Sequence, residues 1–220
     1  MMERRLEAEV MDDPEQVLAY AKADFESENQ GFVDRFLELY DDLDEAHILD
    51  LGCGPGDIPI RLARKHATCR VIGVDASAPM IDWANRLTRE TGLQDRLTFL
   101  CRRFQDLSLD APADALISNS LVHHVPNPLR FWFGVKSLVK AGGAVFVMDL
   151  LRPESEEEAK ALVDQHAAGE SDQLRQDFFN SLLAAFTEDE VAAQLAELNL
   201  SRLMVDVPDD RHWLVCGRVY

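Results

Sequence analysis

The sequence predicts an α/β fold built around a mostly parallel sheet. Through the middle of the chain, short apolar runs alternate with segments of helical periodicity, which is typical of successive strand–helix–strand units. A glycine-rich loop follows the first of these runs. The last two apolar runs are joined by residues 208–211, too few for a helical crossover, so these strands are expected to pair antiparallel. We therefore expect a sheet that is parallel in its body and mixed at one edge.

The alternation gives each element a place along the chain. Strands are expected at residues 46–51, 70–74, 97–101, 115–118, 143–149, 202–207 and 212–219. Helices are expected at residues 57–66, 79–91 and 129–139, the second ended by Gly92 and the third by Gly142 and Gly143. Right-handed crossovers between the parallel strands then place helices on both faces of the sheet.

Two segments lie outside this alternation. Apolar residues recur at helical spacing within residues 14–42, which predicts an N-terminal helical cap divided into two helices at Gly31. Residues 153–186 are predicted to form a helical insertion that begins with an acidic run. Thr187 and Glu190 make a capping box, which marks the start of a further helix. Since no linker or repeat interrupts the pattern, we expect a single domain over residues 1–220.

Composition and charge exclude several classes of partner. The chain has 22 basic and 40 acidic residues, a formal net charge of −18. Such a surface repels a phosphate backbone, so no nucleic-acid partner is expected. The sequence has neither the apolar core of a signal peptide nor an uninterrupted apolar stretch of about 18 residues, which predicts a cytoplasmic protein with no membrane partner. The four cysteines form no Cys-x-x-Cys pair and are expected to be reduced.

The most informative segment is the loop after the first strand, DLGCGPGD at residues 50–57. Glycines at alternate positions allow backbone torsions and close approaches that a Cβ would forbid. Open α/β sheets bind their ligands at the carboxyl ends of the strands, where this loop must lie. By itself, such a loop is equally consistent with a tight turn.

The second strand makes a ligand site the better interpretation. It ends in Asp75, whose carboxylate can accept hydrogen bonds from both hydroxyls of a ribose. The alternative is that Asp75 only caps the strand. The glycine spacing is G-x-G-x-G and differs from the G-x-G-x-x-G of dinucleotide sites. Asp50 and Asp57 flank the loop and would repel a pyrophosphate, but they suit a nucleoside that carries an ammonium and a sulfonium. S-adenosylmethionine carries both groups.

At these positions the sequence closely resembles the class I S-adenosylmethionine-dependent methyltransferases, in particular the group similar to ubiquinone and menaquinone biosynthesis methyltransferases. The resemblance covers about residues 46–149, with a looser match at the last two strands. Four segments carry it in the family's order: DLGCGPG at residues 50–56, GVDAS at 73–77, NSLVHHVPNP at 119–128 and LVKAGG at 138–143. It implies the Rossmann-like fold of that class, a seven-stranded mixed sheet with helices on both faces and an inserted antiparallel last strand.

The resemblance also implies a site for S-adenosylmethionine and its product S-adenosylhomocysteine. Asp50 and Gly52 would hold the methionyl amino group, Gly54 and Gly56 would let the loop pass beneath the cofactor, and Asp75 would bind the ribose. The other residues expected around the cofactor are Cys53, Ala76, Met80, Arg103, Phe104, Asn119 and Ser120.

One part of the family pattern is missing. After the third strand the family usually has Gly-Asp, whose carboxylate faces the adenine amino group, whereas this chain has RRF at residues 102–104. An arginine cannot accept that hydrogen bond. Either Phe104 with nearby backbone completes the adenine pocket, or Asp106 replaces the missing carboxylate.

Three pairs of residues are candidates for contact with the acceptor. His123 and His124 follow the fourth strand, and either imidazole could take a proton from a nucleophile as the catalytic base, although one of them could equally be a packed structural residue. Tyr20 and Phe25 lie on the N-terminal cap, where helix packing is at least as good an explanation. Asp149 and Arg152 leave the fifth strand and could line a substrate pocket, although a salt bridge between them is simpler.

The sequence thus predicts a methyltransferase that moves the methyl group of S-adenosylmethionine to a small-molecule substrate by in-line displacement, with no metal and no covalent intermediate. Two alternatives stay open. One is a protein-modifying methyltransferase that docks its target on residues 153–186. The other is a catalytically silent protein of the same fold that binds cofactor or a partner. Neither the acceptor atom nor the oligomeric state can be read from the sequence.

Overall fold

The computed structural model describes residues 2–8 and 10–220, and in this part of the chain seven strands form one sheet in the order β3-β2-β1-β4-β5-β7-β6. The strands are β1 (His47–Leu51), β2 (Arg70–Asp75), β3 (Leu97–Cys101), β4 (Ala113–Asn119), β5 (Val139–Leu150), β6 (Met204–Asp206) and β7 (His212–Arg218). Neighbouring strands from β1 to β5 pair in parallel, and β7 runs antiparallel between β5 and β6. The predicted α/β class, with a parallel body and a mixed edge, is confirmed.

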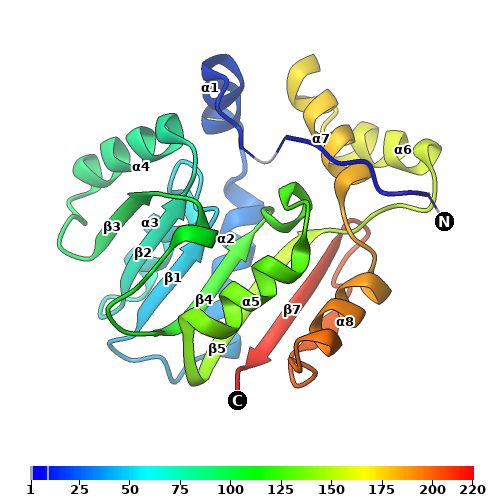
Figure 1. The fold of residues 1–220 in the computed structure, drawn as a ribbon. Coiled ribbons are helices and arrows are strands. Elements are labelled where there is room, and N and C mark those ends of the chain that lie inside the picture. The colour runs from blue at the N-terminus through cyan, green and yellow to red at the C-terminus, as the bar shows by residue number, and fades with distance from the viewer. Residues whose placement is uncertain (1, 9) are drawn as a thin grey trace.

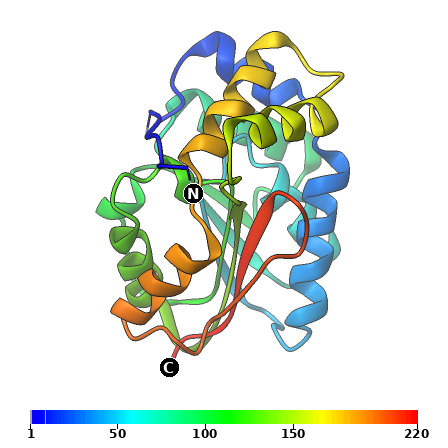
Figure 2. The same ribbon diagram turned by 90° about the vertical axis from the view of Figure 1, so that its right-hand side faces the viewer.

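Helices cover both faces of this sheet and one of its ends. They are α1 (Pro14–Lys22), α2 (Glu26–Leu39), α3 (Asp57–Lys65), α4 (Ala78–Thr91), α5 (Pro128–Leu138), α6 (Glu156–His166), α7 (Asp172–Ala184) and α8 (Glu188–Glu197), with single turns η1 (Phe104–Asp106) and η2 (Val122–His124). Helices α2 and α3 pack on one face, and α5 and α8 on the other (Figures 1 and 2). Helices α1, α6 and α7 lie beyond the carboxyl ends of the parallel strands (Figure 1).

The core is divided by the sheet into two apolar layers. On the side of α2, the fully buried ring of Phe146 in β5 lies with its centroid 4.9 Å from that of Phe32 and 5.8 Å from that of Phe36. On the opposite side, the buried rings of Trp132 and Trp213 have centroids 6.3 Å apart. Burying each such side chain stabilises the fold by about 1.5–3 kcal/mol, so these layers hold the strand ends rigidly in place.

The N-terminal cap is divided at a different place from the predicted one. Helix α2 runs without interruption through Gly31, and the break between α1 and α2 lies at residues 23–25. A glycine inside a helix costs only about 1 kcal/mol relative to alanine. Burial of Phe32, Val33 and Phe36 on the inner side of α2 outweighs that cost. The prediction that Gly31 separates two helices was therefore wrong.

The predicted end of the third crossover helix was also wrong. Helix α5 ends before Val139, which already pairs with Ala113 of β4, so Gly142 and Gly143 lie inside β5. The register of β4 and β5 shifts just after this first pair. Gly142 has φ +78°, and a Cβ on Gly143 would lie 2.5 Å from Val139 Cγ1, so the two glycines permit an irregular strand here.

The predicted insertion consists of two helices, α6 and α7. Ser155 and Ser171 each accept a hydrogen bond at the N-terminus of these helices, and Thr187 with Glu190 makes the predicted capping box of α8. Among the described residues, the structure has no helix long and apolar enough to span a membrane.

Candidate active site

A cavity of about 670 Å³ opens at the carboxyl ends of the parallel strands. Its wall is formed by the glycine loop after β1, the ends of β2 and β4, the turn η2 and the caps α1, α2 and α7. Cavities of about 300–1,000 Å³ hold drug-sized ligands. The structure therefore has a cavity of suitable size where the sequence predicts the ligand site.

The loop after β1 is held by the carboxylate at the end of β2. Asp75 Oδ2 accepts a hydrogen bond from the Gly54 backbone N–H at 2.9 Å, and Asp75 Oδ1 accepts one from the Ser77 N–H at 2.8 Å. Each oxygen keeps a second lone pair for a further donor. Burial raises the pKa of Asp75, and the two backbone hydrogen bonds oppose that rise. The carboxylate thus fixes the loop and can still accept hydrogen bonds from a ligand.

Each of the three loop positions requires glycine for a different structural reason. A Cβ on Gly54 would project into open space, its one neighbour within 4 Å among the described residues being the Tyr20 ring at 4.0 Å. A Cβ on Gly52, where φ is +72°, would lie 2.9 Å from Leu121. A Cβ on Gly56 would lie 2.8 Å from the Ala84 Cβ. Gly54 therefore keeps the cavity open, whereas Gly56 is needed for the close approach of α4.

Asp50 is a buried carboxylate with an unmet hydrogen-bonding capacity. It is 2% exposed, and no group among the described residues hydrogen-bonds to its Oδ2. Burial, followed by the charge of Asp75, raises its pKa well above the usual range. A cationic donor that reached Asp50 would satisfy the free oxygen and offset both effects. This orphaned oxygen fits the ammonium group of the predicted cofactor.

Apolar side chains line another part of the cavity. Met80, Ala76 and Phe104 line it, and the Phe104 ring packs edge-on against Phe131 with centroids 5.7 Å apart. Asp106 does not contribute to the wall among the described residues. Of the two ways to complete an adenine pocket without the family's Gly-Asp, the arrangement favours Phe104 with nearby backbone.

The two predicted catalytic histidines lie at the cavity wall in different environments. His123 is 3% exposed, and its Nδ1 lies 2.5 Å from Asp149 Oδ1. Burial lowers the pKa of His123, but the charge and hydrogen bond of Asp149 outweigh it and raise the pKa above the usual value. Burial, and then the charge of His123, lowers the pKa of His124 to about 3. His124 is therefore neutral at physiological pH, whereas His123 is held by a carboxylate that orients its ring.

Asp149 is itself fixed by the backbone. It is fully buried at the end of β5, where Oδ1 accepts a hydrogen bond from the Leu150 N–H at 2.7 Å and Oδ2 accepts one from the Val122 N–H. Burial raises the pKa of Asp149, but the charge and hydrogen bond of His123 outweigh it and lower the pKa below the usual range. Nε2 of His123 is left as the ring nitrogen that faces away from Asp149.

The structure does not place Asp149 and Arg152 in the cavity wall, contrary to their prediction as substrate residues. Asp149 lies behind His123, and Arg152 donates from Nη2 to Glu190 Oε1 at 2.6 Å. The simpler alternative, a salt bridge between the two, is not found among the described residues either. Each finds its partner on a different element because Arg152 leaves the strand toward α8.

Most of the other predicted site residues do line the cavity. They are Gly52, Gly54, Asp75, Ala76, Met80, Arg103, Phe104, Asn119 and Ser120 of the cofactor set, together with His123, His124, Tyr20 and Phe25. Asp50, Cys53 and Gly56 lie behind the described wall. Cys53 is directed toward β2 instead, where its Sγ would lie 2.9 Å from a Cβ on Gly73.

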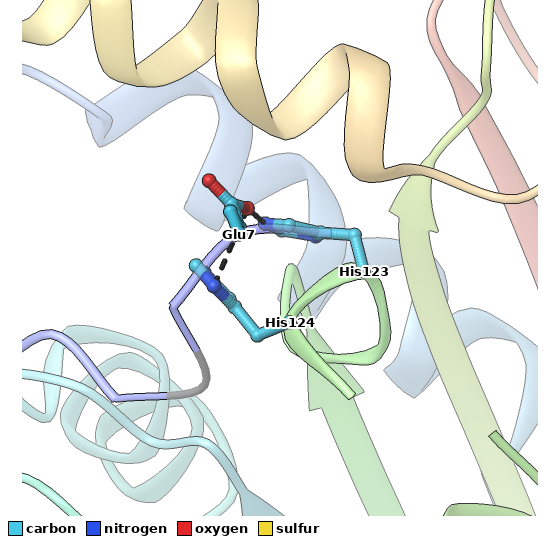
Figure 3. Close-up of side chains that lie close together, drawn as sticks. All are labelled: Glu7, His123 and His124. Carbon is cyan, nitrogen blue, oxygen red and sulfur yellow. Dashed lines mark ion pairs between the residues drawn. The ribbon is translucent and has the colours of Figure 1, made fainter. Parts of the chain in front are cut away.

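One residue at this site was not found from the sequence. Glu7 comes from the N-terminal segment, and its Oε1 lies 3.3 Å from both His123 Nε2 and His124 Nδ1 (Figure 3). The segment is anchored by Arg4, whose Nη2 donates to the His123 carbonyl at 2.7 Å and whose Nε donates to the Ala184 carbonyl at 2.6 Å. No periodicity or spacing near Glu7 indicates this contact, because it depends on where the segment crosses the fold.

The strands and the glycine loop of this site lie in a part of the chain that resembles a known family. Residues 48–143 match the family model described as methyltransferase domain. The fold is that of the class I S-adenosylmethionine-dependent methyltransferases, as the four sequence segments predicted.

Curated relatives match part of the chain. The ubiquinone biosynthesis O-methyltransferase of Coxiella burnetii (strain Dugway 5J108-111) is 32% identical over 119 residues, which are 54% of this chain and 49% of that protein. The trans-aconitate 2-methyltransferase of Streptomyces coelicolor is 31% identical over 102 residues, 46% of this chain and 34% of that protein. The match thus spans about half or less of the length of these relatives.

Solved structures resemble the whole fold. The plantazolicin methyltransferase BamL, in complex with a triazolic desmethylPZN analog and SAH, superposes with a TM-score of 0.72 at 14% identity, covering 91% of this chain and 89% of that one. A SAM-dependent methyltransferase from Aquifex aeolicus gives 0.68 at 17% identity, covering 96% of this chain and 100% of that one.

Proposed function

We propose that the chain binds S-adenosylmethionine on the loop at residues 50–56 and transfers its methyl group in line to a small-molecule acceptor beside His123. One observation carries this proposal, namely that two features line the same cavity. One is Asp75 with the glycine loop that it holds, and the other is the imidazole of His123, which Asp149 orients. When bound, S-adenosylmethionine would supply an activated methyl group on a sulfonium.

The chain's own residues would then mainly position the cofactor and the acceptor and exclude water from them. Asp50 would hold the ammonium group, Asp75 the ribose hydroxyls, and Phe104 and Met80 the adenine. Nε2 of His123 would orient the acceptor or take its proton, and Asp149 would keep the ring in the required orientation. Orientation of this kind can supply a large share of the barrier reduction in a bimolecular transfer.

A small-molecule acceptor is favoured over a protein by the place of the insertion. His166 at the end of α6 and Leu174 and Phe178 of α7 contribute to the cavity wall, so this segment covers the site. A protein target would need a docking surface there instead. The two curated relatives described above are named for ubiquinone biosynthesis O-methylation and trans-aconitate methylation, which supports the same choice. The test is a screen of oxygen, nitrogen, sulfur and carbon acceptors with labelled S-adenosylmethionine, in parallel with whole-cell protein as acceptor.

Replacing Asp75 with alanine should weaken the binding of S-adenosylhomocysteine by about 10-fold to 100-fold. The change removes hydrogen bonds to the ribose worth about 1.5–3 kcal/mol in total. Calorimetric titration measures the loss, with Asp82→Ala as the matched control, since Asp82 is an exposed residue of the adjacent helix α4. Tighter binding of NAD than of S-adenosylhomocysteine by the unaltered chain would contradict the assignment of the cofactor.

Binding of S-adenosylhomocysteine should also slow hydrogen exchange in α1 and α7. Methyl transfer needs a desolvated pocket, and these helices line the cavity beyond the strand ends. The rings of Tyr20 in α1 and of Phe25 lie tilted against each other with centroids 5.0 Å apart, and the Tyr20 ring lies 4.0 Å from the position of a Cβ on Gly54 in the glycine loop. Helix α8 lies on a face of the sheet and serves as the internal reference. Equal protection of all three helices with and without ligand would count against a lid.

A further inference from the structure

We infer that Glu7, His123 and His124 form a binding site for a divalent transition-metal ion, with Zn²⁺ as the simplest occupant. From the sequence alone no metal is expected, and the family match does not cover Glu7. The three side chains come from two segments that are far apart in the sequence, and they lie close together (Figure 3).

The first support is the spacing of the ligand atoms. Glu7 Oε1 lies 3.3 Å from His123 Nε2 and 3.3 Å from His124 Nδ1, and one atom from each residue lies within 4.8 Å of the other two. Ligand atoms bound at about 2.0–2.1 Å to a tetrahedral Zn²⁺ lie about 3.3–3.4 Å from one another. The observed separations are therefore those of two edges of a zinc coordination tetrahedron.

The second support is that the donor set is held in place by other groups. Asp149 accepts from His123 Nδ1, which leaves Nε2 for a ligand, and metal-bound imidazoles usually donate their other ring N–H to a carboxylate or carbonyl in this way. Arg4 fixes the segment that carries Glu7 by its bonds to the backbone of His123 and Ala184. The ligands would thus lose little conformational freedom when an ion binds.

The third support is an oxygen whose hydrogen-bonding capacity is unmet. Glu7 Oε1 is fully buried, yet none of the described groups makes a hydrogen bond to it. Glu7 also lies near two other carboxylates, Asp149 and Asp177, while His123 and Arg4 provide positive charge beside it. A dication would satisfy the oxygen and reduce the repulsion among the carboxylates.

Two imidazoles and one carboxylate also define the kind of ion. Imidazole is a good ligand for zinc, iron, copper and nickel, whereas magnesium and calcium prefer all-oxygen sites. His124 Nδ1 lies 2.9 Å from the Ala8 carbonyl, so coordination requires this imidazole to exchange that hydrogen bond for the ion. The Ala8 oxygen would then remain close by as a further neutral donor.

The site has a consequence for the acceptor, and this consequence rests on the proposed function. Three protein ligands leave a coordination position of a tetrahedral ion open. Because His123 and His124 line the cavity, an acceptor with a hydroxyl or carboxylate oxygen could occupy that position. A metal-bound Nε2 cannot take a proton, so His123 would then orient the acceptor through the ion. The acceptor class would then be an oxygen nucleophile or a molecule that binds through an oxygen next to the methylated atom.

The tag-free full chain is first treated with a chelator and dialysed to remove bound metal. It is then titrated with Zn²⁺ and with Mg²⁺, followed by calorimetry, and with Co²⁺, followed by visible absorption. We expect one equivalent of Zn²⁺ to bind, Co²⁺ to give the intense bands of a tetrahedral site, and Glu7→Gln to weaken both by at least about 10-fold. Glu3→Gln is the matched control, because it makes the same change of charge at an exposed position of the same segment. It should bind like the unaltered chain.

Several results would overturn the inference. They are Zn²⁺ binding that is equal in the two variants, the absence of one-equivalent binding, and Mg²⁺ binding as tight as that of Zn²⁺, as expected for a merely acidic surface. S-adenosylhomocysteine is titrated into the same samples. If the chain binds S-adenosylhomocysteine but does not bind Zn²⁺, the proposed function stands and the metal site is rejected. If it binds Zn²⁺ but not S-adenosylhomocysteine, the proposed cofactor is rejected and the metal site is supported.

Discussion

Replacing His123 with alanine is expected to lower turnover by about 100-fold or more while the affinity for S-adenosylhomocysteine stays unchanged. The imidazole lies at the cavity wall, and Asp149 directs its Nε2 away from the strand end. The alanine variant loses the group that orients or deprotonates the acceptor but keeps the glycine loop and Asp75. Steady-state rates with an acceptor identified by the screen, together with calorimetry of S-adenosylhomocysteine, separate the two effects.

His47→Ala is the control for this measurement, because His47 is exposed at the start of β1, at the opposite end of the strand from the cavity. Its turnover should equal that of the unaltered chain. Asp149→Asn tests the positioning role, since the amide removes the charge that holds the imidazole. It should lower turnover and shift the pH at which the rate is half-maximal. Full activity of the His123→Ala variant would make the Asp149–His123 pair structural.

Replacing Phe146 with alanine is expected to lower the free energy of unfolding by about 3–5 kcal/mol. The ring is fully buried in the middle of β5 and lies edge-on to both Phe32 and Phe36 of α2. Truncation would leave a cavity between the sheet and that helix. For a chain of this size, each kcal/mol corresponds to about 2–4 °C in Tm, so the loss is measurable by thermal as well as urea unfolding.

Phe133→Ala is the matched control for the stability measurement. Phe133 lies on α5 and is 64% exposed, so the same chemical change should alter the free energy of unfolding by no more than about 0.5 kcal/mol. A similar loss of unfolding free energy in both variants would mean that the effect comes from helix or strand propensity. A loss seen only in the Phe146→Ala variant would mean that the stability comes from packing between α2 and the sheet.

The fold could be predicted from the sequence because its signals are local. β1 and β4 are interior strands, so their apolar residues follow one another closely instead of alternating with polar ones. Capping residues such as Ser77 and Thr187 mark helix starts a few residues away. The errors have the same origin. Gly31 is a weak local signal that the buried face of α2 overrides, and Gly142 belongs to a strand whose pairing with β4 begins at a distant residue.

The contact between the glycine loop and Asp75 could be predicted for a related reason. Residues 50–56 and Asp75 come from consecutive strands, and adjacent parallel strands bring their carboxyl ends together. Asp75 and Gly54 accordingly meet through a hydrogen bond of 2.9 Å. The adenine end could be predicted only in outline, since the choice between Phe104 and Asp106 depends on which way the turn η1 directs each side chain.

By itself, the sequence determined the α/β class, the mixed edge of the sheet and the loop that would hold a nucleoside, because periodicity and short spacings encode these directly. The tertiary structure alone decided that Asp149 lies behind His123, that Arg152 turns to Glu190, and that Glu7 reaches the two histidines. The contact from Ala8 to His124 spans 116 residues. The contacts of Glu7 and Ala8 depend on how the N-terminal segment packs against α7 and η2, and no local pattern records that packing.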